Sequence, residues 1–139
     1  MESFCDKNEL TPYGVEGIGL FRTEYLYLTD GKFPDEETQF RVYKKQALAL
    51  NGKSLVIRTQ DIGGDKLLSG KSSQSDTKEA NPFLGMRAIR MTKIHPEIMQ
   101  TQMRAILRAS KFGDVKLLFP MINSMEEIDY LLEMLEQCK

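Results

Sequence analysis

Two segments of the sequence place an arginine and a threonine directly after a short apolar run. Residues 20–24 are LFRTE and residues 56–60 are VIRTQ. If both runs are strands of one parallel sheet, their carboxyl ends lie at the same edge, so Arg22 and Arg58 emerge side by side. Guanidinium groups are permanently charged, and their planar donor forks match a phosphoryl group or a carboxylate. The repeated pattern therefore predicts an anion-binding site at this edge.

A simpler interpretation pairs each of these arginines with a nearby carboxylate, Glu24 or Asp61. The charge distribution bears on the choice. The net charge is −1, yet residues 54–113 carry ten basic and five acidic side chains. A locally basic centre in a neutral chain suits a small anion better than a polyanion, so nucleic acid is not an expected partner. The alternative is a solvated face with a chance bias.

Further donors follow the second arginine. Residues 61–66 are DIGGDK, in which paired glycines allow successive N–H groups to converge on an anion while Lys66 adds a point charge. The alternative for this segment is a plain turn. Arg87 and Arg90 lie three residues apart on a helix predicted over 81–90, so they share a face. One of them can complete the anion site while the other pairs with a carboxylate.

Other charged or titratable residues are assigned structural roles. Arg104 and Arg108 are predicted to face solvent, and the one histidine, His95, is predicted to have a surface or capping role at a helix start. Three carboxylates follow the strand ends and could hold Mg²⁺: Glu24, Asp61 and Asp65. Their spacing does not demand a metal, so salt bridges and turns are the preferred roles. No catalytic residue and no metal ligand is assigned.

Strand and helix patterns alternate along the chain. Short apolar runs predict strands, and amphipathic segments predict helices. The expected strands are residues 17–21, 54–57 and 115–119, and the expected helices are residues 34–50, 81–90, 95–112 and 124–135. This alternation predicts the α/β class with a parallel sheet. About three βα units are present, which makes a partial (βα)8 TIM barrel, since a complete one needs eight.

Composition and length bound the class of protein. The 139 residues, 41% hydrophobic and 28% charged, predict one ordinary globular domain, with a mobile surface loop at residues 69–80. No apolar run is long enough to span a membrane and the N-terminus has no signal-peptide pattern, so a cytoplasmic location is expected. Cys5 and Cys138 have no metal-binding spacing.

Four ordered motifs together resemble Enzyme I, the phosphoenolpyruvate–protein phosphotransferase of the bacterial sugar phosphotransferase system. They are GIGLFRTE at 17–24, IRTQDIGGDK at 57–66, NPFLGMRAIR at 81–90 and FPMI at 119–122. The segment RAILRAS at 104–110 also resembles that family. Pyruvate phosphate dikinase and phosphoenolpyruvate synthase share the first motif, but DIGGDK is typical of Enzyme I. The resemblance covers about residues 14–130.

The resemblance implies a specific fold and activity. The matching domain is a TIM barrel that binds phosphoenolpyruvate and Mg²⁺. The family passes the phosphoryl group to a histidine of a separate N-terminal domain and then to the carrier protein HPr. By resemblance, Arg22 and Arg58 hold the phosphoryl group, Arg87 is a third arginine of the site, and Lys66 lines the pocket. Such donors neutralise charge on the transferring group.

Departures from the family pattern limit this expectation. The family's metal ligands, its catalytic cysteine and its carboxylate-binding residues belong to a later part of the barrel, so we expect none of them in this chain. Gln60 stands where leucine is usual. The chain, residues 1–139, is thus expected to be the N-terminal part of the barrel domain. We expect this fragment to bind phosphoenolpyruvate and to form homodimers as full Enzyme I does. The alternatives are a non-catalytic, self-associating module and another phosphate-binding α/β barrel, such as a lyase.

Overall fold

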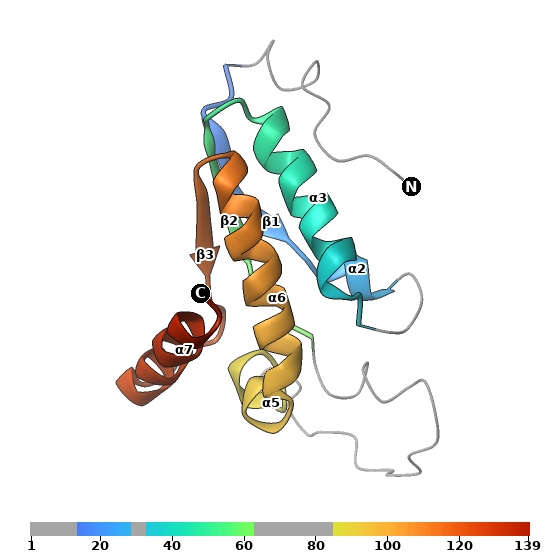
Figure 1. Ribbon diagram of the computed structural model, residues 1–139. Coiled ribbons are helices and arrows are strands. Elements are labelled where there is room, and N and C mark those ends of the chain that lie inside the picture. Colours follow the sequence, from blue (N-terminus) through green and yellow to red (C-terminus); the bar gives the residue numbers. More distant parts are fainter. Residues whose placement is uncertain (1–13, 29–32, 63–84) are drawn as a thin grey trace.

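The computed structural model describes residues 14–28, 33–62 and 85–139 (Figure 1). The strands are β1 (Gly17–Arg22), β2 (Ser54–Arg58) and β3 (Val115–Leu118). The helices are α2 (Tyr25–Leu28), α3 (Glu36–Ala49), α5 (Ile89–Ile94), α6 (Pro96–Ala109), the 3-10 turn η2 (Ser110–Phe112) and α7 (Met125–Gln137). Within these ranges, no helix is long and apolar enough to cross a membrane.

The three strands form one parallel sheet in sequence order, β1-β2-β3. At its carboxyl edge Arg22 is the register partner of Arg58, and Arg58 is the partner of Leu118. The predicted α/β class and parallel sheet are therefore confirmed, as is the expectation that the two arginines lie on neighbouring strand ends. The described residues form three strands of a sheet and stop short of a closed barrel.

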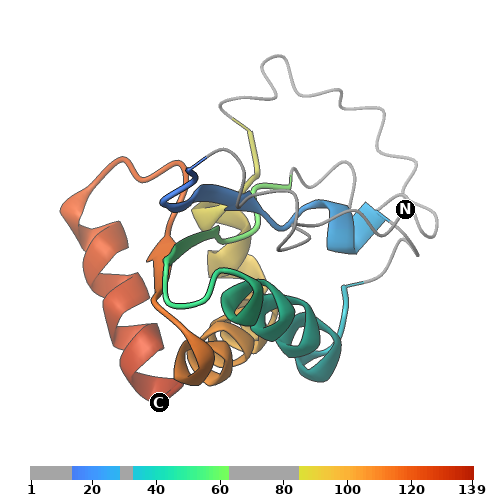
Figure 2. The same ribbon diagram turned by 90° about the horizontal axis from the view of Figure 1, so that it is seen from above.

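Helices α3 and α6 lie side by side against one face of this sheet, and α7 lies next to β3 (Figures 1 and 2). β2 alternates buried and half-buried residues, with Leu55 and Ile57 fully buried toward these helices. Tyr43 of α3 and Ile106 of α6 complete the same core. Burying a side chain of this size contributes about 1.5–3 kcal/mol. The core thus fixes the sheet relative to the helices that follow each strand.

Capping residues define where two of the helices begin. Asp35 accepts a hydrogen bond from the backbone N–H of Thr38 at 2.7 Å and so caps α3. Ser124 caps α7 by accepting from the N–H of Glu127 at 3.4 Å. The carboxylate of Glu127 accepts from the N–H of Asn123. That bond and the ammonium of Lys93 hold the pKa of Glu127 below its usual range.

A second core joins α5, α6 and α7, built from Ile89, Met99, Met103, Leu131 and Met134. The predicted apolar face of the last helix is only partly buried, because Leu132 is 50% exposed. Met125 at the start of α7 is 65% exposed.

The segment around residue 87 differs from its prediction. A helix was expected over 81–90, but among the described residues the helix begins only at Ile89 and continues to Ile94. Ala88 precedes it with a φ of 47°, a left-handed conformation outside the helical region. Arg87 is therefore not on the helix, and it does not share a helical face with Arg90. Residues 81–84 and the predicted loop at 69–80 lie outside the described residues.

Burial of phenol groups makes stability sensitive to alkaline pH. Burial raises the pKa of Tyr25 to about 12 and also raises the pKa values of Tyr27 and Tyr43 above their usual 10. The folded chain keeps these protons where the unfolded chain loses them. The contribution of these phenols to the free energy of unfolding should thus be constant below about pH 10 and fall as pH rises toward 12. Urea midpoints across this range test it. A Tyr43→Phe variant should show a shallower fall, and a flat profile would contradict the prediction.

Candidate functional site

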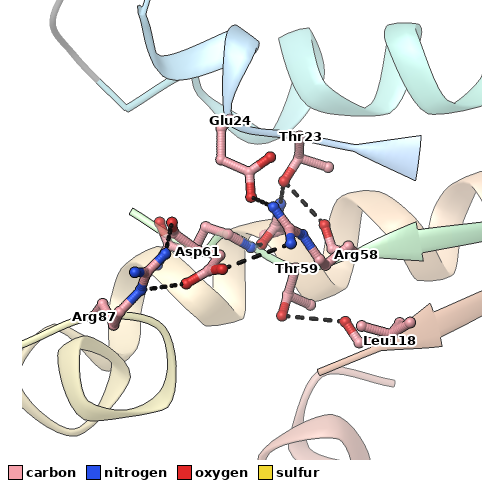
Figure 3. Close-up of polar contacts among 9 residues, drawn as sticks. Thr23, Glu24, Arg58, Thr59, Asp61, Arg87 and Leu118 are labelled. Carbon is pink, nitrogen blue, oxygen red and sulfur yellow. Dashed lines mark hydrogen bonds and ion pairs between the residues drawn. The ribbon is translucent and has the colours of Figure 1, made fainter. Parts of the chain in front are cut away.

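The two threonines that follow the arginines fasten adjacent strand ends together. Thr23 Oγ1 donates to the carbonyl of Arg58 at 3.0 Å, and the N–H of Thr59 donates to the carbonyl of Leu118 at 2.9 Å (Figure 3). Thr59 Oγ1 lies 3.5 Å from the same oxygen. Both threonines are fully buried. The repeated Arg-Thr pattern therefore ties each strand to the next while its arginine stays at the edge.

Arg58 is held by two carboxylates that come from different segments. One terminal nitrogen donates to Glu24 Oε1 at 2.5 Å, and the other lies 3.6 Å from Asp61 Oδ2 (Figure 3). The side chain is 19% exposed. Its Nε N–H is buried and has no acceptor among the described residues. For Arg58, the simpler interpretation, in which the arginine pairs with a nearby carboxylate, is confirmed.

Asp61 bridges Arg58 to a second arginine. Nε of Arg87 donates to Asp61 Oδ1 at 2.8 Å, and an Arg87 terminal nitrogen lies 3.4 Å from the Asp61 carbonyl oxygen (Figure 3). Asp61 is 9% exposed and Arg87 is 20% exposed at the side chain. Arg90, the other candidate, donates to the carbonyl of Gly85 at 2.8 Å. Of the two, Arg87 is thus the residue that joins the strand-end cluster.

Arg22 is the register partner of Arg58, but its side chain differs from those of Arg58 and Arg87 in its contacts. It is exposed, and its side chain has no hydrogen bond or ion pair with another described residue. We define the strand-end cluster as Arg22, Glu24, Arg58, Asp61 and Arg87. Three guanidinium groups and two carboxylates leave one positive charge in excess. Lys66 and the paired glycines before it lie outside the described residues.

Helix α6 supplies a residue that the sequence analysis missed. Gln102 is fully buried, and its side-chain oxygen accepts from the N–H of Gln60 at 2.9 Å. Its amide nitrogen donates to Thr23 Oγ1 and to the hydroxyl of Tyr43, each at 3.1 Å. A glutamine on the buried face of an amphipathic helix was the available signal, because a polar side chain there needs internal partners.

Gln60, two residues after Arg58, carries a buried polar atom without a hydrogen-bond partner among the described residues. The atom is Oε1, and the side chain is 3% exposed. An unmet buried acceptor costs about 1–3 kcal/mol. We expect Gln60→Leu to raise the free energy of unfolding by about 1 kcal/mol.

Urea unfolding of the two proteins measures this difference. Gln39→Leu is the matched control, because Gln39 is equally buried but bonds to Tyr43 and to the carbonyl of Pro34. That variant should be less stable than the wild type. Equal destabilisation by both substitutions would contradict the account of Gln60.

Three residues that were predicted to face solvent or to cap a helix have specific side-chain partners. Arg104 donates to Glu36 at 2.8 Å, and Arg108 donates to Glu36 and Glu37 at 2.9 and 2.7 Å. These arginines are about two-fifths exposed and link α6 to α3, so the expectation that they simply face solvent is wrong. The hydrogen bond from Arg104 is the main cause that lowers the pKa of Glu36. His95 lies 3.2 Å from Glu97 at the start of α6.

The described residues do not fit a magnesium site. They contain no group of three or more histidine, cysteine, aspartate or glutamate side chains able to share an ion. Glu24 and Asp61, the two carboxylates nearest the arginines, are already ion-paired with them. A shallow depression along α7 is lined largely by acidic residues, which disfavours an anionic ligand there. No step is therefore derived through Mg²⁺.

The strand-end cluster has the chemistry of an anion site. Arg58 and Arg87 share Asp61 where the parallel strands end, and Arg22 is the register partner of Arg58. This is the edge at which α/β proteins bind ligands. The guanidinium donors suit oxygens of a phosphoryl group or a carboxylate. The fold and cluster define an α/β protein with a cationic edge.

Comparison with known proteins gives the particular family. Residues 2–139 match the model of the PEP-binding domain of PEP-utilising enzymes, so the chain belongs to this family. It is 50% identical over 135 residues to a phosphoenolpyruvate-protein phosphotransferase of Haemophilus influenzae. It is 48% identical over 134 residues to the protein of that name from Buchnera aphidicola. A third such protein, from Listeria monocytogenes, is 49% identical over 114 residues.

These alignments cover most of this chain and a small part of each relative. They span 97%, 96% and 82% of the chain, but 23%, 23% and 19% of the Haemophilus, Buchnera and Listeria proteins. The chain thus spans less than a quarter of the length of the curated relatives it matches. The resemblance to this group of phosphotransferases is confirmed.

Proposed function

We propose that this chain supplies the phosphoryl-binding part of a phosphoenolpyruvate-protein phosphotransferase. In this proposal Arg22, Arg58 and Arg87 contact the phosphoryl group of phosphoenolpyruvate, and Lys66 lines the same pocket. The observation that carries the proposal is the register of Arg22 and Arg58 on neighbouring parallel strand ends. The family match supports phosphoenolpyruvate as the ligand.

The two carboxylates of the strand-end cluster take part in this proposal as internal counter-ions. Glu24 and Asp61 keep Arg58 and Arg87 oriented before the ligand arrives. An incoming phosphoryl group carries more charge than a carboxylate and offers three oxygens, so it competes for the same donors. Arg22, which is exposed at the end of β1, makes the first contact.

Titration with phosphoenolpyruvate, followed by NMR of the chain, tests this proposal. The wild type should show saturable shifts at the strand ends. Arg22→Ala should weaken binding by about ten-fold, equivalent to about 1.4 kcal/mol. It is the cleaner of two variants, because no described partner is left behind. Arg58→Ala should weaken binding further, although it also leaves Glu24 and Asp61 without a shared cation.

Arg41→Ala is the matched control, since Arg41 is a 76% exposed arginine on α3. It should bind as the wild type does. Equal shifts in the wild type, Arg22→Ala and Arg58→Ala would overturn the proposal. Inorganic phosphate, titrated in parallel, distinguishes recognition of the phosphoryl group from recognition of the whole molecule.

The remaining features of the family enter as proposals on the same resemblance. In a full-length protein the residues of this chain would form part of a closed TIM barrel in the cytoplasm. That protein would use Mg²⁺ bound by residues outside those described here. It would pass the phosphoryl group to a histidine of an N-terminal domain and then to HPr, for sugar uptake.

Self-association is the second candidate function, and one observation favours it. Helix α7 exposes Met125, Ile128 and Leu132, which are 65%, 37% and 50% accessible and share one side of the helix. Contiguous exposed apolar side chains are typical of an interface. Light scattering separates the two candidates. A monomer that binds phosphoenolpyruvate supports the binding function, and a tight dimer indifferent to it supports the self-associating module.

A further inference from the structure

One buried side chain contacts the backbone segments that follow both strand-end arginines. Gln102 of α6 donates to Thr23, which follows Arg22, and accepts from the N–H of Gln60, two residues after Arg58. The distances are 3.1 and 2.9 Å, and Gln102 is fully buried. A single amide therefore joins the ends of β1 and β2 from the helix side.

The direction of these hydrogen bonds is set by the chemistry of the groups. Thr23 Oγ1 has one proton, and it receives a bond from the Gln102 amide. A carbonyl oxygen can only accept, so the Thr23 hydroxyl donates its proton to the carbonyl of Arg58, 3.0 Å away. The result is a continuous path from α6 through the end of β1 to Arg58 itself.

A second branch of hydrogen bonds runs from the Gln102 amide to α3. The Gln102 amide nitrogen also donates to the hydroxyl of Tyr43, which in turn donates to Gln39 Oε1 at 3.0 Å. Gln39 donates onward to the carbonyl of Pro34 at 3.0 Å. The orientation of the amide does not depend on this branch, because the N–H of Gln60 can only donate and so requires the Gln102 oxygen on its side. This branch leads away from the strand ends.

From this arrangement we propose that Gln102 is a positioning residue for the strand-end cluster. It sets the relative placement of Arg22 and Arg58, acting through Thr23 and the backbone of Gln60. The inference rests on the proposed function, because it concerns the geometry needed to share one phosphoryl group between two arginines. Packing alone gives no reason for an amide here, since Met99, Met103 and Ile106 of the same helix are buried apolar residues.

The test compares Gln102→Met with Tyr43→Phe in the full chain. Methionine keeps the length of the side chain but removes its bonds to both strand ends. Phenylalanine removes a bond in the other branch only. Three quantities are measured: the affinity for inorganic phosphate by NMR titration, the exchange rate of the Gln60 amide proton, and the urea midpoint.

We expect Gln102→Met to weaken phosphate binding by about ten-fold and to expose the Gln60 amide to exchange. Tyr43→Phe should lower the urea midpoint but leave phosphate affinity within about two-fold and the Gln60 amide protected. If Gln102 has only a structural role, phosphate affinity should fall in step with the urea midpoint in both variants. That result would overturn the proposal.

Thr23→Val provides a second route, and it decides the question if Gln102→Met does not fold. It breaks the path from Gln102 to Arg58 while leaving the bond between Gln102 and Gln60. Weaker phosphate binding with a protected Gln60 amide is the expected result, and unchanged binding would contradict the proposal.

The same experiment keeps this inference separate from the proposed function. If Arg22→Ala weakens binding but Gln102→Met and Thr23→Val do not, the function stands and the positioning role falls. If the wild type shows no saturable binding, the proposed function fails. The backbone shifts of Arg22 and Arg58 in Gln102→Met then decide the positioning role. Both must move for it to survive.

Discussion

Replacing Gly17 by alanine is expected to destabilise the chain by about 1–3 kcal/mol, the usual cost of forcing extra atoms into a packed site. A Cβ atom at Gly17 would lie 2.5 Å from the carbonyl oxygen of Ser54, its register partner on β2. That oxygen is backbone and cannot rotate away. Strand β1 would have to move from β2, and Arg22 at its far end would move with it.

Gly19→Ala is the matched control within the same strand. A Cβ atom at Gly19 meets nothing within 4 Å. Alanine there should leave stability unchanged or raise it by about 0.4–1 kcal/mol, because it restricts the unfolded chain. Urea midpoints of the two variants give the comparison directly. Equal effects would show that the approach of β1 to β2 at Gly17 does not limit packing.

The second large effect concerns turnover. We expect the purified chain to release no pyruvate from phosphoenolpyruvate, even with Mg²⁺, HPr and a separately added N-terminal domain of the family. Phosphoryl transfer needs an in-line acceptor, positioned charge and correct orientation together. The described residues supply the arginines. Their one histidine, His95, is bonded to Glu97, and their carboxylates form no metal-binding group.

Exposure also weakens the charge interactions of Arg22. Arg22 is open to water, where a charge interaction is several-fold weaker than in a closed site. A coupled lactate dehydrogenase assay measures pyruvate directly. Pyruvate above the no-protein blank that disappears in Arg58→Ala would show that this prediction is wrong.

Local patterns in the sequence were sufficient for most elements of the fold. Helix α3 follows from a proline and an acidic first turn, and the strands follow from short apolar runs between polar residues. The four-residue helix α2 was missed because one turn is too short to show periodicity. The start of α5 was misplaced because Ala88 has a positive φ, which no local sequence pattern predicts for an alanine.

The candidate site was predictable in its location but not in its pairing. Parallel topology alone brings Arg22 beside Arg58. The sequence offered Glu24 and Asp61 as partners for either arginine, and only the structure shows that Arg58 takes both while Asp61 is shared with Arg87. Gln102 lies 79 residues from Thr23, and no local pattern encodes a contact at that separation.

The order of the strands in the sheet has an evolutionary consequence. Each strand pairs with its neighbour in the sequence, so the segment from Gly17 to Ala109 contains both arginines, the carboxylates between them and the glutamine behind them. Recombination between related genes near Gly113, in the turn before β3, would exchange this segment as one unit. On the proposed function, the residues that recognise the charged group of a substrate would thereby be inherited separately from those that complete the reaction.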